Sequence, residues 1–172
     1  MQLCAPAEIR RAVVLLIAGV SFAAAPACTE VVADSSACRK LEYKNGGVER
    51  AQYLPCAAEM VAALDDLDRQ TKAALDGDGQ ARSEGRATLR RVTALMAAAG
   101  GRQLLERWPD RHLTDLNVDI SNAVSRYEAF YLVRILDESS PFAKESRAAA
   151  AAEYQGGNRR YEEARRLLRR LD

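Results

Sequence analysis

Three cysteines beyond the first 27 residues have the types and spacing that point to covalent chemistry: Cys28, Cys38 and Cys56. In an oxidising compartment an odd number of cysteines leaves one thiol without an intramolecular partner. Attachment of diacylglycerol to Cys28 would remove the odd thiol and leave Cys38 and Cys56 as a disulfide pair. That bond would stabilise the fold by about 3 kcal/mol, because it restricts the unfolded chain. The alternatives are a Cys28–Cys38 bond and three free or buried thiols.

The compartment is indicated by residues 1–27, which have the composition of a bacterial signal peptide. A basic pair, Arg10 and Arg11, precedes an apolar run over residues 12–22 and then small residues up to Ala27. The apolar run is shorter than the roughly 20 residues that a bilayer-spanning helix needs. We therefore expect export followed by cleavage, rather than a retained transmembrane anchor.

The residue order before Cys28 is compatible with two cleavage products. Ordinary signal peptidase would leave Cys28 as a free first residue, whereas lipoprotein processing would attach acyl chains to its sulfur. Ala27 fits a lipobox, but Ala25 replaces the usual Leu or Val, and Pro26 is unusual there. Because the odd cysteine count favours lipidation, we expect Cys28 to anchor the mature protein to a membrane surface.

The remaining residue types do not form a catalytic or metal-binding pattern. His112 is the only histidine, which excludes a multi-histidine metal site. The acidic loop that begins at Asp76 fails the calcium-loop pattern, because Ala81 and Ala87 stand where a Gly and a bidentate Glu are required. We expect a protein without catalytic activity, metal or cofactor, and we expect Asp65 and its neighbours Asp66 and Asp68 to face solvent.

Two groups of side chains are candidates for binding surfaces. Tyr127, Phe130 and Tyr131 are expected to line a groove between helices that accepts a protein partner, and Trp108 lies in a loop that is expected to be exposed. The C-terminal arginines form the one basic patch of the sequence. Those expected to contact an anionic lipid or polymer surface are Arg159, Arg160, Arg166 and Arg170. The alternative is a solvated helix face in which they pair with Glu162 and Glu163.

The net charge gives no reason to expect nucleic-acid binding. The full chain has 25 Lys and Arg against 24 Asp and Glu. Removal of residues 1–27 takes away Arg10, Arg11 and Glu8, which leaves 23 of each sign. A neutral protein has no overall field that attracts phosphate backbones. Alanine, leucine, arginine and glutamate are abundant while aromatic and β-branched residues are sparse, which favours helices over strands.

The periodicity of apolar residues predicts a series of helices separated by Gly, Pro and Asp turns. The third of the long helices has the strongest apolar stripe and is the expected centre of the core. The expected helices run from Ser36 to Lys44, from Tyr53 to Leu75, from Ser83 to Trp108 with an interruption at Gly100-Gly101, from Leu113 to Ile135, from Ser140 to Gln155 and from Arg159 to Leu171. A hairpin near Asn45-Gly46 is the alternative to the first of them.

Short connections favour antiparallel packing of neighbouring helices. We therefore expect an all-α protein, a small antiparallel bundle of four to six helices, with residues 28–35 as a tether and residues 36–172 as one domain. The Cys38–Cys56 bond would join its N-terminal helices.

One segment of the chain resembles a known family. Residues 48–56, followed by Val61, Leu64 and Asp65, are similar to the start of small helical secreted proteins related to the lysozyme-inhibitor LprI family. Thr71 departs from that pattern at a position where an aromatic residue is expected. The resemblance implies that inhibition of an envelope hydrolase such as lysozyme is one alternative function. The leading expectation is a lipid-anchored helical adaptor in the bacterial envelope, and a secreted soluble protein is a further alternative.

Overall fold

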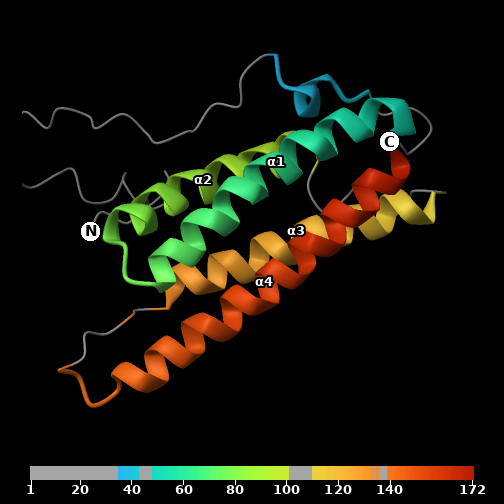
Figure 1. The fold of residues 1–172 in the computed structure, drawn as a ribbon. Coiled ribbons are helices and arrows are strands. Elements are labelled where there is room, and N and C mark those ends of the chain that lie inside the picture. The colour runs from blue at the N-terminus through green and yellow to red at the C-terminus, as the bar shows by residue number, and fades with distance from the viewer. Residues whose placement is uncertain (1–34, 43–47, 101–109, 134, 136–138) are drawn as a thin grey trace, which may run out of the picture.

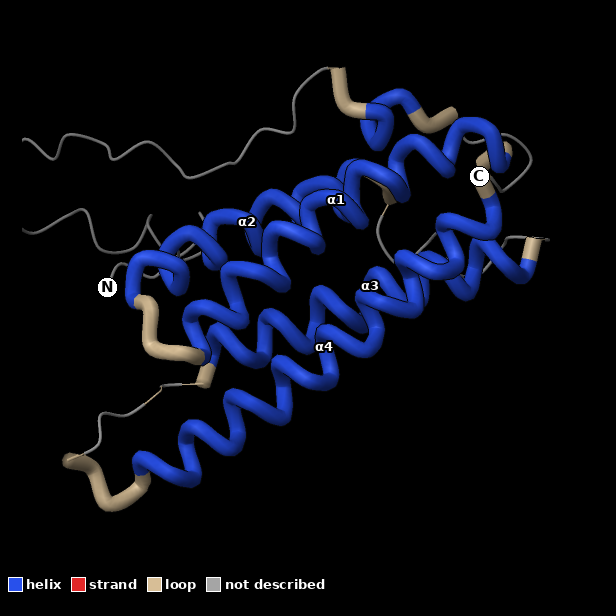
Figure 2. The backbone as a smooth tube through the Cα atoms, viewed as in Figure 1, coloured by secondary structure: helices blue, strands red, loops and turns tan. Residues whose placement is uncertain are grey.

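A computed structural model describes residues 35–42, 48–100, 110–133, 135 and 139–172. These residues form four α-helices and one short 3-10 helix, and no strand occurs among them (Figure 2). The elements are η2 (Ala37–Lys40), α1 (Arg50–Leu75), α2 (Gly79–Ala98), α3 (Arg111–Leu132) and α4 (Ala143–Leu171). The all-helical fold class expected from composition is confirmed for this part of the chain. The expected signal segment, residues 1–27, lies outside it.

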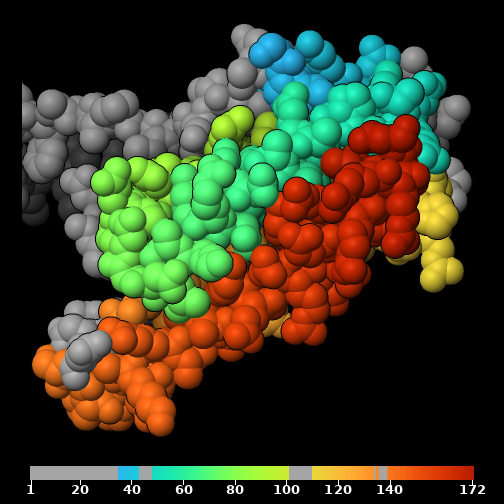
Figure 3. Space-filling model, in the orientation of Figure 1, coloured from blue at the N-terminus to red at the C-terminus, as the bar shows by residue number. Residues whose placement is uncertain are grey.

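Successive helices run in opposite directions and form a helical bundle (Figure 1). α1 and α2 lie side by side as one pair, and α3 and α4 form a second pair. α1 also packs against both α3 and α4, so the two pairs share a core. In Figure 3 α4 crosses the visible face beside α1, and its first turns project beyond the other helices.

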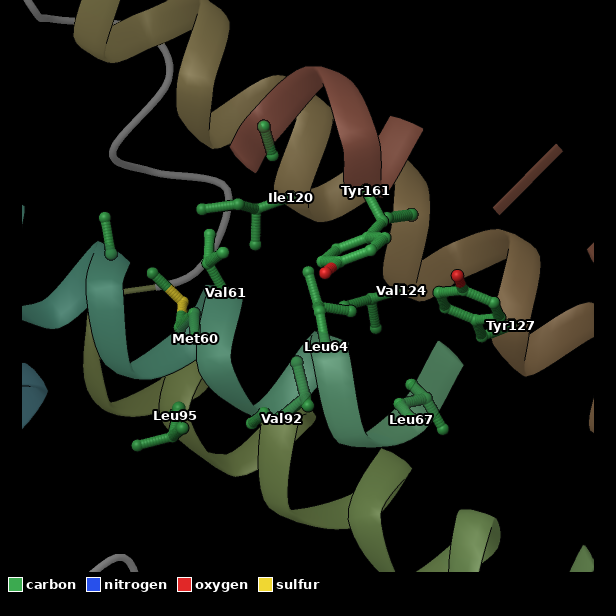
Figure 4. Packing of buried hydrophobic residues seen from close by; sticks show 14 of the residues in the cluster. Met60, Val61, Leu64, Leu67, Val92, Leu95, Ile120, Val124, Tyr127 and Tyr161 are labelled. Atoms are coloured by element: carbon green, nitrogen blue, oxygen red, sulfur yellow. The ribbon is translucent and has the colours of Figure 1, made fainter. Parts of the chain in front are cut away.

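The core is built by apolar side chains from all four helices. Figure 4 shows Leu64 of α1 lying among Val92 of α2, Val124 of α3 and Tyr161 of α4, and all four side chains are buried. The predicted apolar stripe of α1 is buried from Ala57 to Thr71, as its spacing indicated. Burial of apolar surface on this scale is the main stabilising contribution in a bundle of this size.

Three of the four buried tyrosines among the described residues point their hydroxyl groups at carboxylate or amide side chains of neighbouring helices. The Tyr127 hydroxyl donates to the carboxylate of Asp68 over 2.6 Å, and the Tyr161 hydroxyl donates to the carboxylate of Asp65. Burial, together with the hydrogen bonds to these carboxylates, raises the pKa of Tyr127 and Tyr161, which keeps both phenols protonated as donors. The third, Tyr53, donates to an amide oxygen of α3 over 3.0 Å. Asp65 is exposed, as expected, and Asp68 is half-buried, but both carboxylates also accept hydrogen bonds from core tyrosines, which was not expected.

The start of α1 differs from the sequence expectation. The helix begins at Arg50 rather than Tyr53, so Pro55 lies in its second turn instead of its first. At this position proline removes the backbone hydrogen bond that residue 55 would donate to the Ala51 carbonyl, at the start of the helix where only one turn precedes it. The predicted end of α1 at Leu75 is confirmed.

The turn between α1 and α2 places the cap of α2 earlier than predicted. The Asp78 carboxylate accepts a hydrogen bond from the backbone N–H of Ala81 over 2.9 Å, so α2 begins at Gly79 and Ser83 lies inside the helix. Gly77 has a φ of 106°, a conformation that glycine adopts without strain. Asp78 thus acts as a helix cap in the acidic loop, which explains the residue type without a bound ion.

The end of α2 agrees with the expected interruption. The helix ends at Ala98, and Gly100 adopts a φ of 87° directly after it. Leu104 and Trp108 lie outside the described residues. α3 then begins at Arg111, where the Asp110 carboxylate accepts a hydrogen bond from the His112 backbone N–H over 2.9 Å.

The predicted break at Gly156-Gly157-Asn158 is wrong, because α4 continues through these residues as one helix. The expected first helix of this region also starts later, at Ala143 rather than near Ser140. Gly157 is buried against the ring of Tyr127, and an added Cβ would lie 2.9 Å from Cε1 of that ring. The glycine therefore permits close packing of α4 on α3 and does not end the helix.

The two adjacent glycines of α4 give a matched test of this close packing. Gly157→Ala is expected to lower the free energy of unfolding by about 1–2 kcal/mol, because overpacking against the buried ring outweighs the gain in helix propensity. Gly156→Ala is the control, since its Cβ would meet only the flexible Arg126 side chain, at 3.3 Å from Cδ. The control is expected to be neutral or stabilising by up to about 1 kcal/mol in urea denaturation. Equal effects of the two substitutions would contradict the packing role of Gly157.

Arginines from one helix bind the C-terminal carbonyl groups of another. Arg50 of α1 donates to the Leu171 carbonyl at the end of α4 over 2.6 Å, and Arg82 of α2 donates to the Val133 carbonyl at the end of α3 over 2.6 Å. Such carbonyls lack intrahelical partners and carry partial negative charge. These contacts link the two helix pairs at their ends, and the apolar periodicity of the sequence gave no indication of them.

Candidate functional site

The predicted disulfide bond between Cys38 and Cys56 is present. The two Sγ atoms are 2.09 Å apart, and both side chains are fully buried. The bond joins η2 to the first half of α1, which is the expected link between the N-terminal helices. The proposed lipidation site, Cys28, lies outside the described residues.

A glutamate on α1 holds the same end of the chain by hydrogen bonds. The Ser36 hydroxyl donates to Oε2 of Glu59 over 2.6 Å, and the Ala37 backbone N–H donates to Oε1 over 2.8 Å. Ser36 also caps η2, as predicted, by accepting a hydrogen bond from the Cys38 backbone N–H over 3.2 Å. η2 ends at Lys40, earlier than the predicted Lys44, which lies outside the described residues. The role of Glu59 was not foreseen, because its partners are distant in the sequence.

The aromatic residues expected to line a groove are buried in the core instead. Tyr127 and Phe130 are fully buried, and Tyr131 is 6% exposed. The Tyr131 hydroxyl lies 3.0 Å from the hydroxyl of Thr71 on α1 and packs over Gly85 of α2. These rings join helices to one another, so these three residues do not form a surface for a partner. Trp108 lies outside the described residues.

The C-terminal arginines divide into paired and unpaired groups. Arg160 contacts the carboxylate of Asp119 on α3 over 3.0 Å, and Arg166 contacts Glu163 over 3.2 Å. Among the described residues, Arg159 and Arg170 have no acidic partner. The basic patch is therefore in part a salt-bridged helix face and in part an unneutralised surface.

Two neighbouring clefts lie along the groove between α3 and α4, and both include Arg160. The larger, of about 490 Å³, has mixed charge and is lined by Asp115, Val118, Asp119, Arg160, Glu163, Arg166, Leu167 and Arg170. The smaller, of about 270 Å³, has no acidic residue in its lining, which consists of Asn122, Ser125, Arg126, Gly156, Arg159 and Arg160. All four arginines expected to contact anions therefore line one surface groove. We call this region the α3–α4 groove.

The Asp119 carboxylate fixes the position of Arg160 between the two clefts. The Asp119 side chain is only 9% exposed, whereas that of Arg160 is 48% exposed. Burial raises the pKa of Asp119, and the hydrogen bond and charge of Arg160 act in the opposite direction. Because the raised pKa means that ionisation is disfavoured in the folded state, the contribution of Asp119 to stability falls as pH rises through that pKa.

Removal of the Arg160 charge is expected to make this pH dependence steeper. Arg160→Gln leaves the buried Asp119 carboxylate without its cation and raises its pKa further, so the variant loses about 1–3 kcal/mol of stability near pH 7. Near pH 4 the loss is expected to be smaller, because a protonated Asp119 does not need the cation. Urea denaturation at both pH values measures the difference, with Arg165→Gln as a control that removes an exposed charge from the same helix. A loss independent of pH would contradict this account.

The described residues contain no group of three or more His, Cys, Asp or Glu side chains that would hold a metal ion. No helix in this part of the chain combines the length and apolar character needed to cross a membrane. His112 lies exposed in the first turn of α3. The α3–α4 groove presents arginine donors beside the carboxylates of Asp115, Asp119 and Glu163.

Comparison with known proteins gives no family assignment. No protein-family model, curated protein or solved structure matches the chain.

Proposed function

We propose that the chain is exported, anchored to a membrane by lipid on Cys28, and acts in the bacterial envelope by binding. The observation that supports this proposal most strongly is the Cys38–Cys56 bond. Disulfides persist in oxidising compartments such as the periplasm and are rare in the cytosol. The bond also accounts for two of the three cysteines of the expected mature chain and leaves Cys28 for another use.

The α3–α4 groove is the surface that supports the binding role. It contains arginines on both sides of Arg160. Two of them, Arg159 and Arg170, lack an acidic partner among the described residues. Exposed unpaired charges attract partners of opposite charge. We therefore propose the α3–α4 groove as the contact surface, in place of the aromatic residues that were expected to form it and are buried. Its partner is then an anionic component of the envelope.

Intact-mass measurement on the protein from the membrane fraction tests export and anchoring together. We expect loss of residues 1–27, an added diacylglycerol mass on Cys28 and a deficit of two hydrogens for the Cys38–Cys56 bond. Cys28→Ala is the control, and it should move the protein from the membrane fraction while leaving the disulfide in place. Recovery of the full-length, reduced chain from the cytosol would overturn the proposal.

A further inference from the structure

The smaller cleft of the α3–α4 groove has the composition of an anion site. Its side-chain lining consists of hydrogen-bond donors: three guanidinium groups, the amide of Asn122 and the hydroxyl of Ser125. Gly156 contributes no side chain, which keeps the floor of the cleft open. We propose that this cleft binds a phosphoryl group, and we call it the phosphoryl cleft. The proposal names the ligand class for the binding role and rests on that proposed function for its place in the envelope.

The guanidinium groups at two sides of the phosphoryl cleft are held in place by carboxylates outside its lining. Arg126 of α3 pairs with Glu153 over 3.0 Å, and Arg160 of α4 pairs with the nearly buried Asp119 over 3.0 Å. Each arginine has five N–H donors in a planar fork, so one carboxylate contact leaves others for a ligand. The side chains of Arg126 and Arg160 are still 58% and 48% exposed. Two oriented cations are therefore available on opposite helices.

Of the three guanidinium groups in the phosphoryl cleft, that of Arg159 is the one without an acidic partner among the described residues. A bound anion would give this guanidinium its counter-charge. The Arg159 side chain is exposed and makes no hydrogen bond or ion pair with the described residues, so its replacement is expected to test binding without a large effect on stability.

A phosphoryl group fits these donors better than a carboxylate does. It presents three acceptor oxygens and, as a monoester, a charge of about −1.5 to −2 near neutral pH. Guanidinium groups bind such oxygens in pairs of parallel hydrogen bonds, and here three of them surround one cleft of about 270 Å³. The larger cleft is a poorer anion site, because Asp115, Asp119 and Glu163 lie in its lining.

Titration of the purified, disulfide-bonded protein with inorganic phosphate tests the proposal. We expect saturable binding in isothermal titration calorimetry, and we expect Arg159→Gln to weaken it about tenfold or more, the effect of losing one charged hydrogen-bonding group. Arg165→Gln is the matched control, since it removes the same charge from the same helix outside the phosphoryl cleft. Its affinity for phosphate should stay within about twofold of the unmodified protein.

Vesicles distinguish the two sources of a phosphoryl group. If the natural ligand is a lipid headgroup, vesicles of phosphatidylglycerol bind the protein, Arg159→Gln weakens that binding, and inorganic phosphate competes with it. If the ligand is a soluble or polymeric phosphate ester, Arg159→Gln weakens phosphate binding while vesicle binding is unchanged. Both results support the phosphoryl cleft.

The proposal is overturned if neither phosphate nor vesicles show a loss specific to Arg159→Gln. An equal loss in the Arg159 and Arg165 variants would also overturn it, because general attraction to the basic helix would then explain the binding. These titrations use purified protein, so their failure is separate from that of export and lipidation, which the mass measurement decides.

Discussion

Loss of the Cys38–Cys56 disulfide is expected to lower the free energy of unfolding by about 3 kcal/mol, because the bond closes a loop in the unfolded chain. The sequence separation of its cysteines is 18. For a domain of this size the corresponding fall in Tm is about 10 °C. Thermal denaturation of Cys38→Ala/Cys56→Ala, followed by circular dichroism, measures the effect.

A reducing agent provides the control for this prediction. It should lower the Tm of the unmodified protein to near that of the double variant, and it should leave the variant itself unchanged. Glu59 still binds Ser36 and Ala37 in the reduced protein, so the helices should remain folded at low temperature. A double variant with an unchanged Tm would show that the bond does not restrict the unfolded chain as we argue.

Gly85→Ala is expected to destabilise the protein by about 2–4 kcal/mol. A Cβ at this position of α2 would lie 1.7 Å from the hydroxyl oxygen of Tyr131 and 2.7 Å from Cζ of its ring. Because these distances are far below van der Waals contact, the buried ring must move. The movement would also separate the Tyr131 hydroxyl from Thr71, which lies 3.0 Å away. Urea denaturation gives the change in stability.

A double-mutant cycle separates the clash from a general effect of alanine. In a Tyr131→Leu background the added cost of Gly85→Ala should fall by at least about 1 kcal/mol, because the clashing atoms are absent. Gly79→Ala, whose Cβ would meet nothing within 4 Å, should change stability little. If the cost of Gly85→Ala is the same in both backgrounds, contact with Tyr131 is not its cause.

Helix faces and turns that depend only on residues close in the sequence could be predicted. The apolar stripe of α3 and the turn after Leu75 are in the structure as expected. The errors arose where contacts between distant residues decide the outcome. The sequence alone indicates Gly157 as a helix breaker, yet it lies inside a continuous helix, packed against Tyr127 of α3. Asp78, rather than Ser83, caps α2 because the carboxylate reaches the free N–H of Ala81.

The sequence predicted which residue types form the candidate site, but not which of them contact one another. Cysteine parity indicated the Cys38–Cys56 pair, and the clustering of arginines indicated a basic helix face. The pairing of Arg160 with Asp119 was not predictable, because 41 residues separate them and no local pattern links α3 to α4. The role expected of Tyr127 failed for the same physical reason. Apolar periodicity shows which face of a helix is apolar, but not whether another helix covers it.

If Cys28 carries the proposed lipid anchor, the attachment of η2 to α1 determines how a mechanical load from the membrane would travel through the protein. A pull transmitted from Cys28 reaches Cys38 and then passes through the sulfur atoms directly into α1 at Cys56. The disulfide is the shorter covalent path between these two residues. Force therefore enters α1 in its second turn through a covalent bond, rather than through the noncovalent contacts of η2.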